Sequence, residues 1–228
     1  MSPQLLAFVA AGTIAMLAVA FLCRPVFQLS VLKTVLLTLC LTVAGVAGVA
    51  LLFFVENGRF GGVSFFGAVL LVPLLLFPLS RLLRLSYPVY LDLAAPMVSV
   101  MLAVMKVNCY LSGCCQGKVL YHDAAGQAVR FPSQLTELGM ALLLAVILIV
   151  CIKGGVLSGL RFPLFMILYS VTRFVMNFLR ETEPFVLGMA AGNFWAIIST
   201  LAGLVWFGVY YMNKRGKTGD GPPESLLQ

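Results

Sequence analysis

Two cationic side chains, Lys106 and Arg173, lie within long apolar stretches of a chain that keeps most other charges near the ends of such stretches. A cation at bilayer depth costs several kcal/mol, and proteins retain one there mainly where a pocket or polar cavity requires it. Each stands in an unusually polar motif, KVNCYLSGCCQGK (106–118) for the lysine and YSVTRFVMNFLRETE (169–183) for the arginine. The pattern indicates an intramembrane site for an anionic ligand.

A polar stripe runs along the stretch that contains Arg173. Its members recur at i, i+4, i+8 and i+11: Tyr169, Arg173, Asn177 and Arg180. This spacing places them on one face of an otherwise apolar helix, and we expect that face to turn toward the interior or a wet cavity. The planar guanidinium of Arg173 suits a phosphate or a carboxylate. An internal ion pair with Glu137 is the alternative, and both roles can hold at once.

The lysine motif predicts a second polar face. An ammonium, a phenol and two glycines that permit close approach recur at i, i+4, i+7 and i+11: Lys106, Tyr110, Gly113 and Gly117. The alternative is a structural lysine that extends its side chain to the membrane interface, since Lys106 lies about two turns below the outer end of its stretch.

Two further segments carry polar groups near the same end. Gln134 and Glu137 share a face at the start of the fifth apolar stretch, because they are three residues apart, and could orient the cations or the ligand. The Gly-rich segment NGRFGGVSFFGA (57–68) includes Gly62 and Ser64. It either brings backbone amide groups close to a ligand or forms a tight outer loop.

The cysteines do not match a zinc pattern. They are Cys23, Cys40, Cys109, Cys114, Cys115 and Cys151. Adjacent cysteines rarely bind one metal together, and the chain has no second CxxC motif and a single histidine, His122. For the three cysteines near the outer surface, both a redox or disulfide role and simple packing are open. We predict no metal site and no cofactor.

The composition defines the class of protein. Of 228 residues, 61% are hydrophobic and 10% are charged, which is typical of an integral membrane protein. We predict an all-α polytopic fold with seven transmembrane helices, over residues 5–23, 31–55, 63–79, 89–113, 134–152, 161–178 and 188–212. They would form one domain, 1–212, followed by a cytoplasmic tail, 213–228, whose composition is typical of disorder.

The basic residues predict the orientation, because Lys and Arg favour the cytoplasmic side. With the amino terminus outside, the inner segments hold Arg24, Lys33, Arg81, Arg84, Lys153, Arg161, Lys214, Arg215 and Lys217, and the outer segments hold Arg59, Lys118, Arg130 and Arg180. This asymmetry accounts for the net charge of +7. Because the charges are spread over loops, we predict no nucleic-acid partner.

Taken in order, these motifs resemble those of the prolipoprotein diacylglyceryl transferase family. The corresponding segments are GGVSFFG (61–67), DLAAP (92–96), KVNCYLSGCCQGK (106–118), FPSQLTE (131–137), YSVTRFVMNFLR (169–180) and GN (192–193), and they extend over about residues 57–210. Members of that family transfer the diacylglyceryl group of phosphatidylglycerol to a cysteine thiol of a lipoprotein precursor and release glycerol phosphate. The resemblance implies seven spans with the amino terminus outside, and it marks Arg173 and Gly117 as important for activity.

The chain departs from the family pattern at several positions. The family histidine of the first motif is Phe66, the histidine before Pro-Ser-Gln is Phe131, and the signature arginine is Lys106, which keeps the charge but loses the bidentate fork. The other departures are Cys109 for the signature asparagine, with Asn108 beside it, Cys114 for a glutamate and Thr136 for a tyrosine. Phenylalanine cannot transfer a proton, so any activity would need Lys106, Tyr110 or the substrate itself as the base.

We therefore predict a transferase of the bacterial inner membrane that acts on phosphatidylglycerol and a lipoprotein-precursor cysteine, with Arg173, Lys106 and Glu137 as catalytic residues. The predicted substrate-binding residues are Gln134, Gly117, Asn108, Tyr110, Asn177, Arg180, Gly62 and Ser64. The alternative is a catalytically silent lipid-binding or accessory membrane protein of the same fold. Loss of the two histidines favours this alternative, and retention of Arg173, Gly117, Gln134 and Glu137 favours the enzyme. A transporter is less compatible, because the sequence shows no inverted repeat.

Overall fold

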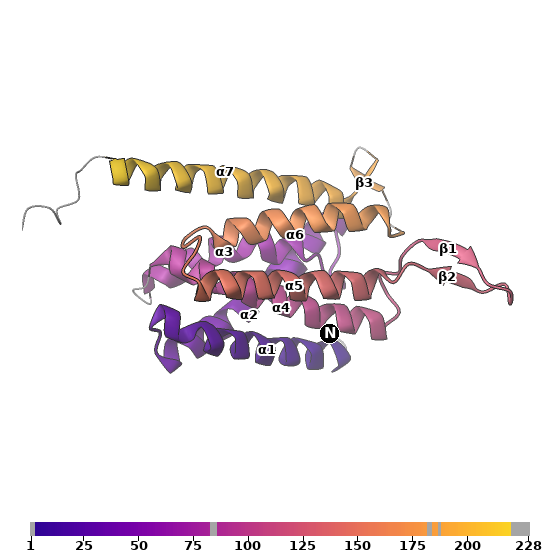
Figure 1. The fold of residues 1–228 in the computed structure, drawn as a ribbon. Helices are drawn as coiled ribbons and strands as arrows, with labels where there is room; N and C mark the ends of the chain where they lie inside the picture. Colours follow the sequence, from indigo (N-terminus) through magenta and orange to yellow (C-terminus); the bar gives the residue numbers. More distant parts are fainter. Residues whose placement is uncertain (1–2, 83–85, 182–183, 187, 220–228) are drawn as a thin grey trace, which may run out of the picture.

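The computed structural model describes residues 3–82, 86–181, 184–186 and 188–219. Within these residues the chain forms seven helices and two short hairpins (Figure 1). The helices are α1 (Pro3–Phe27), α2 (Val31–Asn57), α3 (Phe66–Leu82), α4 (Tyr87–Leu111), α5 (Ser133–Lys153), α6 (Arg161–Phe178) and α7 (Ala191–Gly219). The strands are β1 (Val119–His122), β2 (Ala128–Arg130), β3 (Pro184–Val186) and β4 (Met189–Ala190).

The apolar stretches of the sequence become membrane-length helices. By length and composition, five helices of the described chain can cross a membrane: α1, α2, α4, α5 and residues Ala191–Asn213 of α7; α3 is a shorter apolar helix. The 18-residue α6 carries the polar stripe. The prediction of an all-α polytopic membrane protein is confirmed, and each predicted span coincides with a helix.

The end of α7 differs from the prediction. The helix continues to Gly219, so residues 213–219, which the sequence analysis assigned to a disordered tail, are helical. The run that follows Met212 is rich in Lys and Arg, which are good helix formers and do not end a helix by themselves. The rest of the predicted tail, 220–228, lies outside the described residues.

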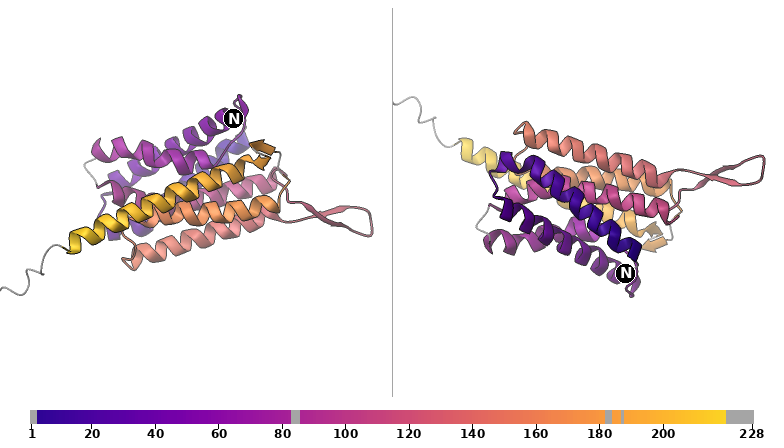
Figure 2. Two further views of the ribbon diagram at one scale, coloured as in Figure 1. Left: turned by 90° about the horizontal axis from the view of Figure 1, so that it is seen from above. Right: turned by 90° about the horizontal axis from the view of Figure 1, so that it is seen from below.

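The helices run roughly along one direction, with α4 at the centre (Figures 1 and 2). In α4, 67% of an 18-residue apolar window is buried, against 17–33% in the other four membrane-length helices. This difference arises because α1, α3, α5 and α6 all pack on α4. The lysine motif (106–118) begins in α4, the most buried of these helices, and α5 and α6, which carry Glu137 and Arg173, pack against it.

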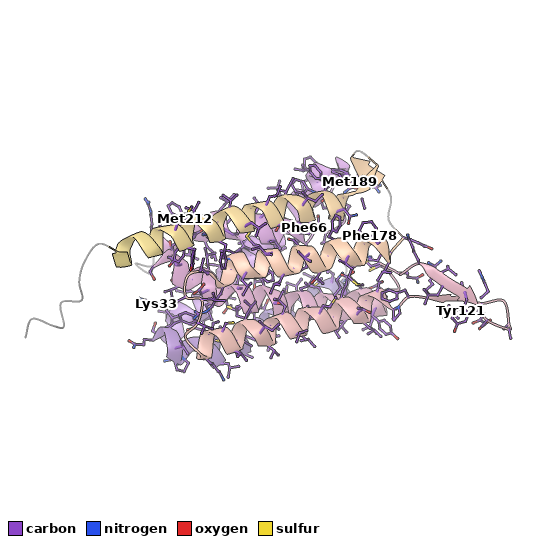
Figure 3. The ribbon with its side chains drawn as sticks, turned by 45° about the horizontal axis from the view of Figure 1, so that its top comes forward. Lys33, Phe66, Tyr121, Phe178, Met189 and Met212 are labelled. Carbon is purple, nitrogen blue, oxygen red and sulfur yellow. The ribbon has the colours of Figure 1, made fainter. Side chains whose placement is uncertain are left out.

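The bundle has two distinct ends. The hairpin of β1 and β2 projects beyond one end, here called the hairpin end, where α1 also begins (Figure 1). Tyr121, Phe178 and Met189 lie toward this end, and Lys33 and Met212 toward the opposite end (Figure 3). The first helix thus begins at one end and the last helix finishes at the other, as an odd number of crossings requires.

A buried ion pair fixes the opposite end of α4. The carboxylate of Asp92 accepts hydrogen bonds from the Arg161 guanidinium at 3.0 Å, from the Arg161 backbone N–H at 3.1 Å and from the Gly159 N–H at 2.6 Å. Both side chains are almost completely buried. Asp92 thereby anchors the connection between α5 and α6, whereas Lys106, fourteen residues further along α4, pairs with Glu137.

Candidate functional site

Glu137, on the second turn of α5, pairs with three cations. Its Oε1 accepts from Arg173 Nη1 at 2.6 Å and from Arg180 Nη1 at 2.9 Å, and its Oε2 pairs with the ammonium of Lys106. These four residues, here called the Glu137 cluster, come from α4, α5, α6 and the residues just after α6. The predicted Arg173–Glu137 ion pair is confirmed, and Lys106 and Arg173 lie on the same carboxylate rather than on opposite sides of the bundle.

The Glu137 cluster carries an excess of positive charge. Three cations face one carboxylate, which leaves a formal net charge of +2. The side chains of Lys106, Glu137 and Arg180 are only 7–9% exposed, whereas that of Arg173 is 18% exposed. Uncompensated buried charge is costly, so such a cluster is stabilised by an anion. Arg173 is the cation of the cluster most open to one.

The polar stripe of α6 faces inward, as predicted, over most of its length. Tyr169 and Asn177 are buried, and Asn177 Nδ2 donates to Asn193 Oδ1 of α7 at 2.8 Å. Arg180 is also buried, although α6 ends at Phe178, so its inward position does not result from helical spacing. Arg180 reaches Glu137 from the following segment, which pairs with Gly117 in an antiparallel bridge.

The predicted face of the lysine motif is wrong beyond the end of α4, at Gly113 and Gly117. Helix α4 ends at Leu111, and Gly113 has a left-handed φ of 64°, which turns the chain before Gly117 is reached. Tyr110 is 54% exposed and does not line the cavity described below, whereas Lys106 is buried. Gly117 is packed so closely on the backbone and side chain of Phe131 that a Cβ would overlap them. Its small size is required for packing of the loop on the segment that precedes α5.

Gln134 holds the loop rather than the cations. Its Nε2 donates to the carbonyl of Cys114 at 2.7 Å, and Ser133 Oγ donates to the carbonyl of Cys115 at 2.7 Å. The first turn of α5 therefore fixes the backbone of the segment that follows α4. Gln134 and Glu137 share a helix face as predicted, but Gln134 positions the loop while Glu137 pairs with the cations.

A large cavity adjoins the Glu137 cluster. Its volume is 1190 Å³, and its polar wall includes Lys106, Asn108, Arg173 and Ser64. Apolar residues of α1, α2 and α4 form much of the remaining wall, among them Leu5, Val9, Met16, Leu41, Val46, Phe53 and Leu102. The cavity is thus amphipathic, with cations at one part of its surface and aliphatic side chains over much of the rest.

Asn108 has an unused polar atom at this cavity. Its Oδ1 is buried and has no hydrogen-bond partner among the described residues. Buried amide oxygens are normally paired, so this one is a polar atom without a partner in a residue that lines the cavity. Asn108 is one of the predicted substrate-binding residues.

The Gly-rich segment before α3 also lines the cavity. Ser64 Oγ donates to Glu56 Oε1 at 2.6 Å, and its backbone N–H donates to the Val49 carbonyl at 3.1 Å. Gly62 lies so close to the ring of Phe53 that a side chain would collide with it. Both predicted residues therefore hold this segment against α2, where it forms part of the cavity wall.

Phe66 forms an apolar part of the wall. It is 3% exposed, lines the cavity and packs on Tyr169 with ring centroids 5.3 Å apart. No histidine is found among the described residues that line the cavity. Phe66 occupies the place where the resemblance puts the family's histidine, so the structure offers no imidazole there.

Near the cluster, three cysteines gather, which the sequence analysis did not anticipate. The sulfur atoms of Cys109, Cys114 and Cys115 all lie within 4.8 Å of one another. The pKa of the Cys115 thiol is lowered to about 4, mainly by a hydrogen bond with Cys109 and then by the charges of Arg180 and Lys106, against the opposing effect of burial. Spacing along the chain gave no sign of this, because it depends on the turn after α4.

Fold and site together define a multi-pass helical membrane protein with a buried, net-positive ion cluster beside an amphipathic cavity. A family model described as prolipoprotein diacylglyceryl transferase matches residues 6–209. The chain therefore belongs to the prolipoprotein diacylglyceryl transferase family, as its motifs suggested.

Similar proteins carry a common name, phosphatidylglycerol–prolipoprotein diacylglyceryl transferase. One from Dehalococcoides mccartyi is 28% identical over 170 residues, which cover 70% of this chain and 65% of the relative. One from Idiomarina loihiensis is 30% identical over 174 residues, 67% of this chain and 64% of the relative. One from Geobacter sulfurreducens is 30% identical over 141 residues, 59% of this chain and 54% of the relative. The chain thus matches between about half and two thirds of the length of these relatives, 54–65%.

Proposed function

We propose that this protein transfers the diacylglyceryl group of phosphatidylglycerol to a cysteine thiol in the signal region of a lipoprotein precursor. The proposed location is the bacterial inner membrane, with the amino terminus and the hairpin end outside. The observation that carries the proposal is the net-positive Glu137 cluster on the wall of an amphipathic cavity. A phospholipid has the matching chemistry, an anionic phosphate joined to two apolar chains.

In this proposal different residues of the site bind the phosphate, the glycerol and the acyl chains of the lipid. Arg173 and Lys106 bind the lipid phosphate, with Arg173 in the leading role because its guanidinium is the most exposed of the cluster. Glu137 holds these cations in place and also pairs with Arg180. Asn108 lies on the cavity wall, and a rotation of its side chain would bring the unpaired Oδ1 to a glycerol hydroxyl. The acyl chains lie along the aliphatic wall formed by α1 and α2.

The proposed reaction breaks the C–O bond between the diacylglycerol and the phosphate and forms a C–S bond to the acceptor thiol. Glycerol phosphate leaves with the bonding electrons, and the cations stabilise the charge that develops on it. Tyr110 lies away from the cavity and Lys106 is an ammonium in an ion pair, so neither is placed to accept the thiol proton. We assign the proton to the departing phosphate, a substrate-assisted step.

A second candidate function is binding of an anionic lipid without transfer. The observation that favours it is Phe66, an apolar side chain at the cavity wall where the family pattern has a histidine. In this case the Glu137 cluster would bind the lipid and the acceptor thiol would not be deprotonated.

One reconstitution separates the two functions. The purified protein is placed in vesicles that contain phosphatidylglycerol, a peptide with a lipoprotein signal cysteine is added, and release of glycerol phosphate is measured. The transferase predicts release by the wild type, loss with Arg173→Ala and no change with Arg81→Ala, an exposed cation at the opposite end. If Arg173→Ala weakens lipid binding but neither the wild type nor any variant releases glycerol phosphate, the result supports the second candidate, a lipid-binding protein without transferase activity. Equal lipid binding by wild type and Arg173→Ala would contradict both.

A further inference from the structure

The thiols of Cys109, Cys114 and Cys115, here called the cysteine cluster, form the one group of three metal-ligating side chains found among the described residues. The transferase proposal gives them no role. All three line the cavity, and Cys114 and Cys115 lie on the loop that Ser133 and Gln134 hold. They are free thiols, and no histidine or carboxylate of the described residues joins the group.

The backbone after α4 explains why the thiols converge. Cys109 lies in the last turn of α4, and the left-handed Gly113 folds the chain back, so that the Cys114 N–H donates to the Cys109 carbonyl at 3.1 Å. Cys115 itself has a φ of 60°, which is uncommon for a residue with a side chain. Such strained conformations occur mainly where the surroundings fix them, often at functional sites. The reversal places both later sulfurs beside that of Cys109.

The loop is also held from the other side. Ser133 donates a 2.7 Å hydrogen bond to the carbonyl of Cys115, and Gln134 donates one of 2.7 Å to the carbonyl of Cys114. These two bonds restrict the movement of the loop. The positions of the backbone atoms that carry two of the three thiols are therefore fixed by α5. A fixed backbone of this kind is what a preformed ligand site requires.

The sulfur separations suit a single metal ion. A thiolate–metal distance of about 2.3 Å places three sulfurs about 4.0 Å apart in a trigonal arrangement. The observed limit of 4.8 Å is within reach of that value by small side-chain rotations. Thiolates are soft ligands that select soft cations, and a set of three sulfurs without a fourth protein ligand does not complete the tetrahedron that structural zinc demands.

The electrostatic setting also favours a low-charge cation. The Glu137 cluster, with its formal net charge of +2, lines the same cavity through Lys106 and Arg173, so it repels a monovalent cation less than a divalent one. We propose that Cys109, Cys114 and Cys115 form a three-sulfur binding site for a soft monovalent cation, Cu(I), on the cavity wall, although the adjacency of two of them in the sequence argued against a shared metal. This proposal does not depend on the transferase activity, since it requires only the loop and its thiols.

The experiment is an anaerobic titration of the reduced, purified protein with Cu(I) in competition with bicinchoninate, a chromophoric Cu(I) chelator. The expected result is one tightly held Cu(I) per chain, with an X-ray absorption spectrum of three-coordinate copper bound to sulfur. Cys109→Ser, Cys114→Ser and Cys115→Ser should each weaken binding by at least the roughly 10- to 100-fold that loss of a supporting partner costs a metal site. Serine keeps the side-chain size, so the fold should persist.

A cysteine outside the cluster, Cys151, provides the control for this experiment. Cys151→Ser removes a partly buried thiol of α5 outside the cluster and should leave the Cu(I) affinity unchanged. The thermal unfolding of every variant is measured, so that a loss of Cu(I) binding caused by misfolding is recognised. If a single variant does not fold, a double variant of the other two cysteines is tested in its place. The proposal is overturned if the triple variant binds Cu(I) as tightly as the wild type, or if the spectrum shows two-coordinate copper. Gln134→Ala, which frees the Cys114 carbonyl but keeps all three thiols, should weaken binding less than removal of a thiol.

Discussion

Arg173 and Lys106 approach one another through opposite oxygens of a single carboxylate, that of Glu137. Arg173 Nη1 lies 2.6 Å from Oε1, and Lys106 pairs with Oε2. Two cations that are 67 residues apart in the sequence are thereby brought to one anion site. The carboxylate neutralises only part of their charge, because Arg180 shares it. The following predictions test the consequences of this arrangement.

Removal of the central carboxylate should destabilise the fold. Glu137→Gln leaves three buried or half-buried cations without their partner, and uncompensated buried charge of this kind costs about 3–5 kcal/mol. The measurement is denaturant or thermal unfolding in detergent. Glu181→Gln is the matched control, since Glu181 pairs with Arg130 at 2.8 Å but is more than half exposed, and such a pair contributes at most about 1 kcal/mol. Equal losses in the two variants would contradict the assigned role of Glu137.

Removal of the other buried carboxylate should affect stability but not the lipid site. Asp92→Asn leaves Arg161 buried and unpaired at the opposite end of the bundle, at a cost of the same order, about 3–5 kcal/mol. Because Asp92 is far from the Glu137 cluster along α4, the affinity for phosphatidylglycerol should not change in the folded fraction. The measurement pairs an unfolding curve with lipid binding in detergent. A fall in lipid affinity comparable to that of Lys106→Met would show that the two ends are coupled.

The ammonium of Lys106 should contribute directly to lipid binding. Lys106→Met keeps the side-chain length but removes the charge, and a hydrogen bond to a charged group is worth about 1.5–3 kcal/mol, which corresponds to roughly a 10- to 100-fold loss of affinity. Lys106→Arg restores the residue type of the family pattern and should bind at least as well, because a guanidinium can form a bidentate contact with phosphate. Native mass spectrometry with phosphatidylglycerol measures both. Unchanged binding in Lys106→Met would remove Lys106 from the site.

A histidine at position 66 should supply the missing base. General base catalysis by a positioned imidazole contributes roughly 10²–10⁴ in rate, so Phe66→His should raise glycerol phosphate release in the reconstituted assay. The imidazole accepts a proton only in its neutral form, so the gained activity should fall as the pH decreases through about 6.5. Phe66→Leu keeps the wall apolar and should show neither effect. A gain without pH dependence would point to packing rather than proton transfer.

The amino-acid sequence by itself determined the class of the protein and the faces of its helices. Apolar length predicted each membrane helix, and helical spacing predicted that Tyr169, Arg173 and Asn177 face inward, because the period of a helix is a local property of the backbone. The ion pair between Arg173 and Glu137 was the alternative that the sequence left open beside an anion site, and the structure contains it. The motif order predicted the family to which the chain belongs.

Only the tertiary structure decided how the residues beyond the helix ends are placed. Helical spacing put Gly113 and Gly117 on the face of Lys106, but α4 ends at Leu111 and the left-handed Gly113 reverses the chain, so the period no longer applies to them. The same reversal brings three cysteines together, and packing between α4, α5 and α6 brings Lys106, Arg173 and Arg180 to one carboxylate. These contacts join residues distant in sequence, and they depend on the docking of whole helices, which no local pattern encodes.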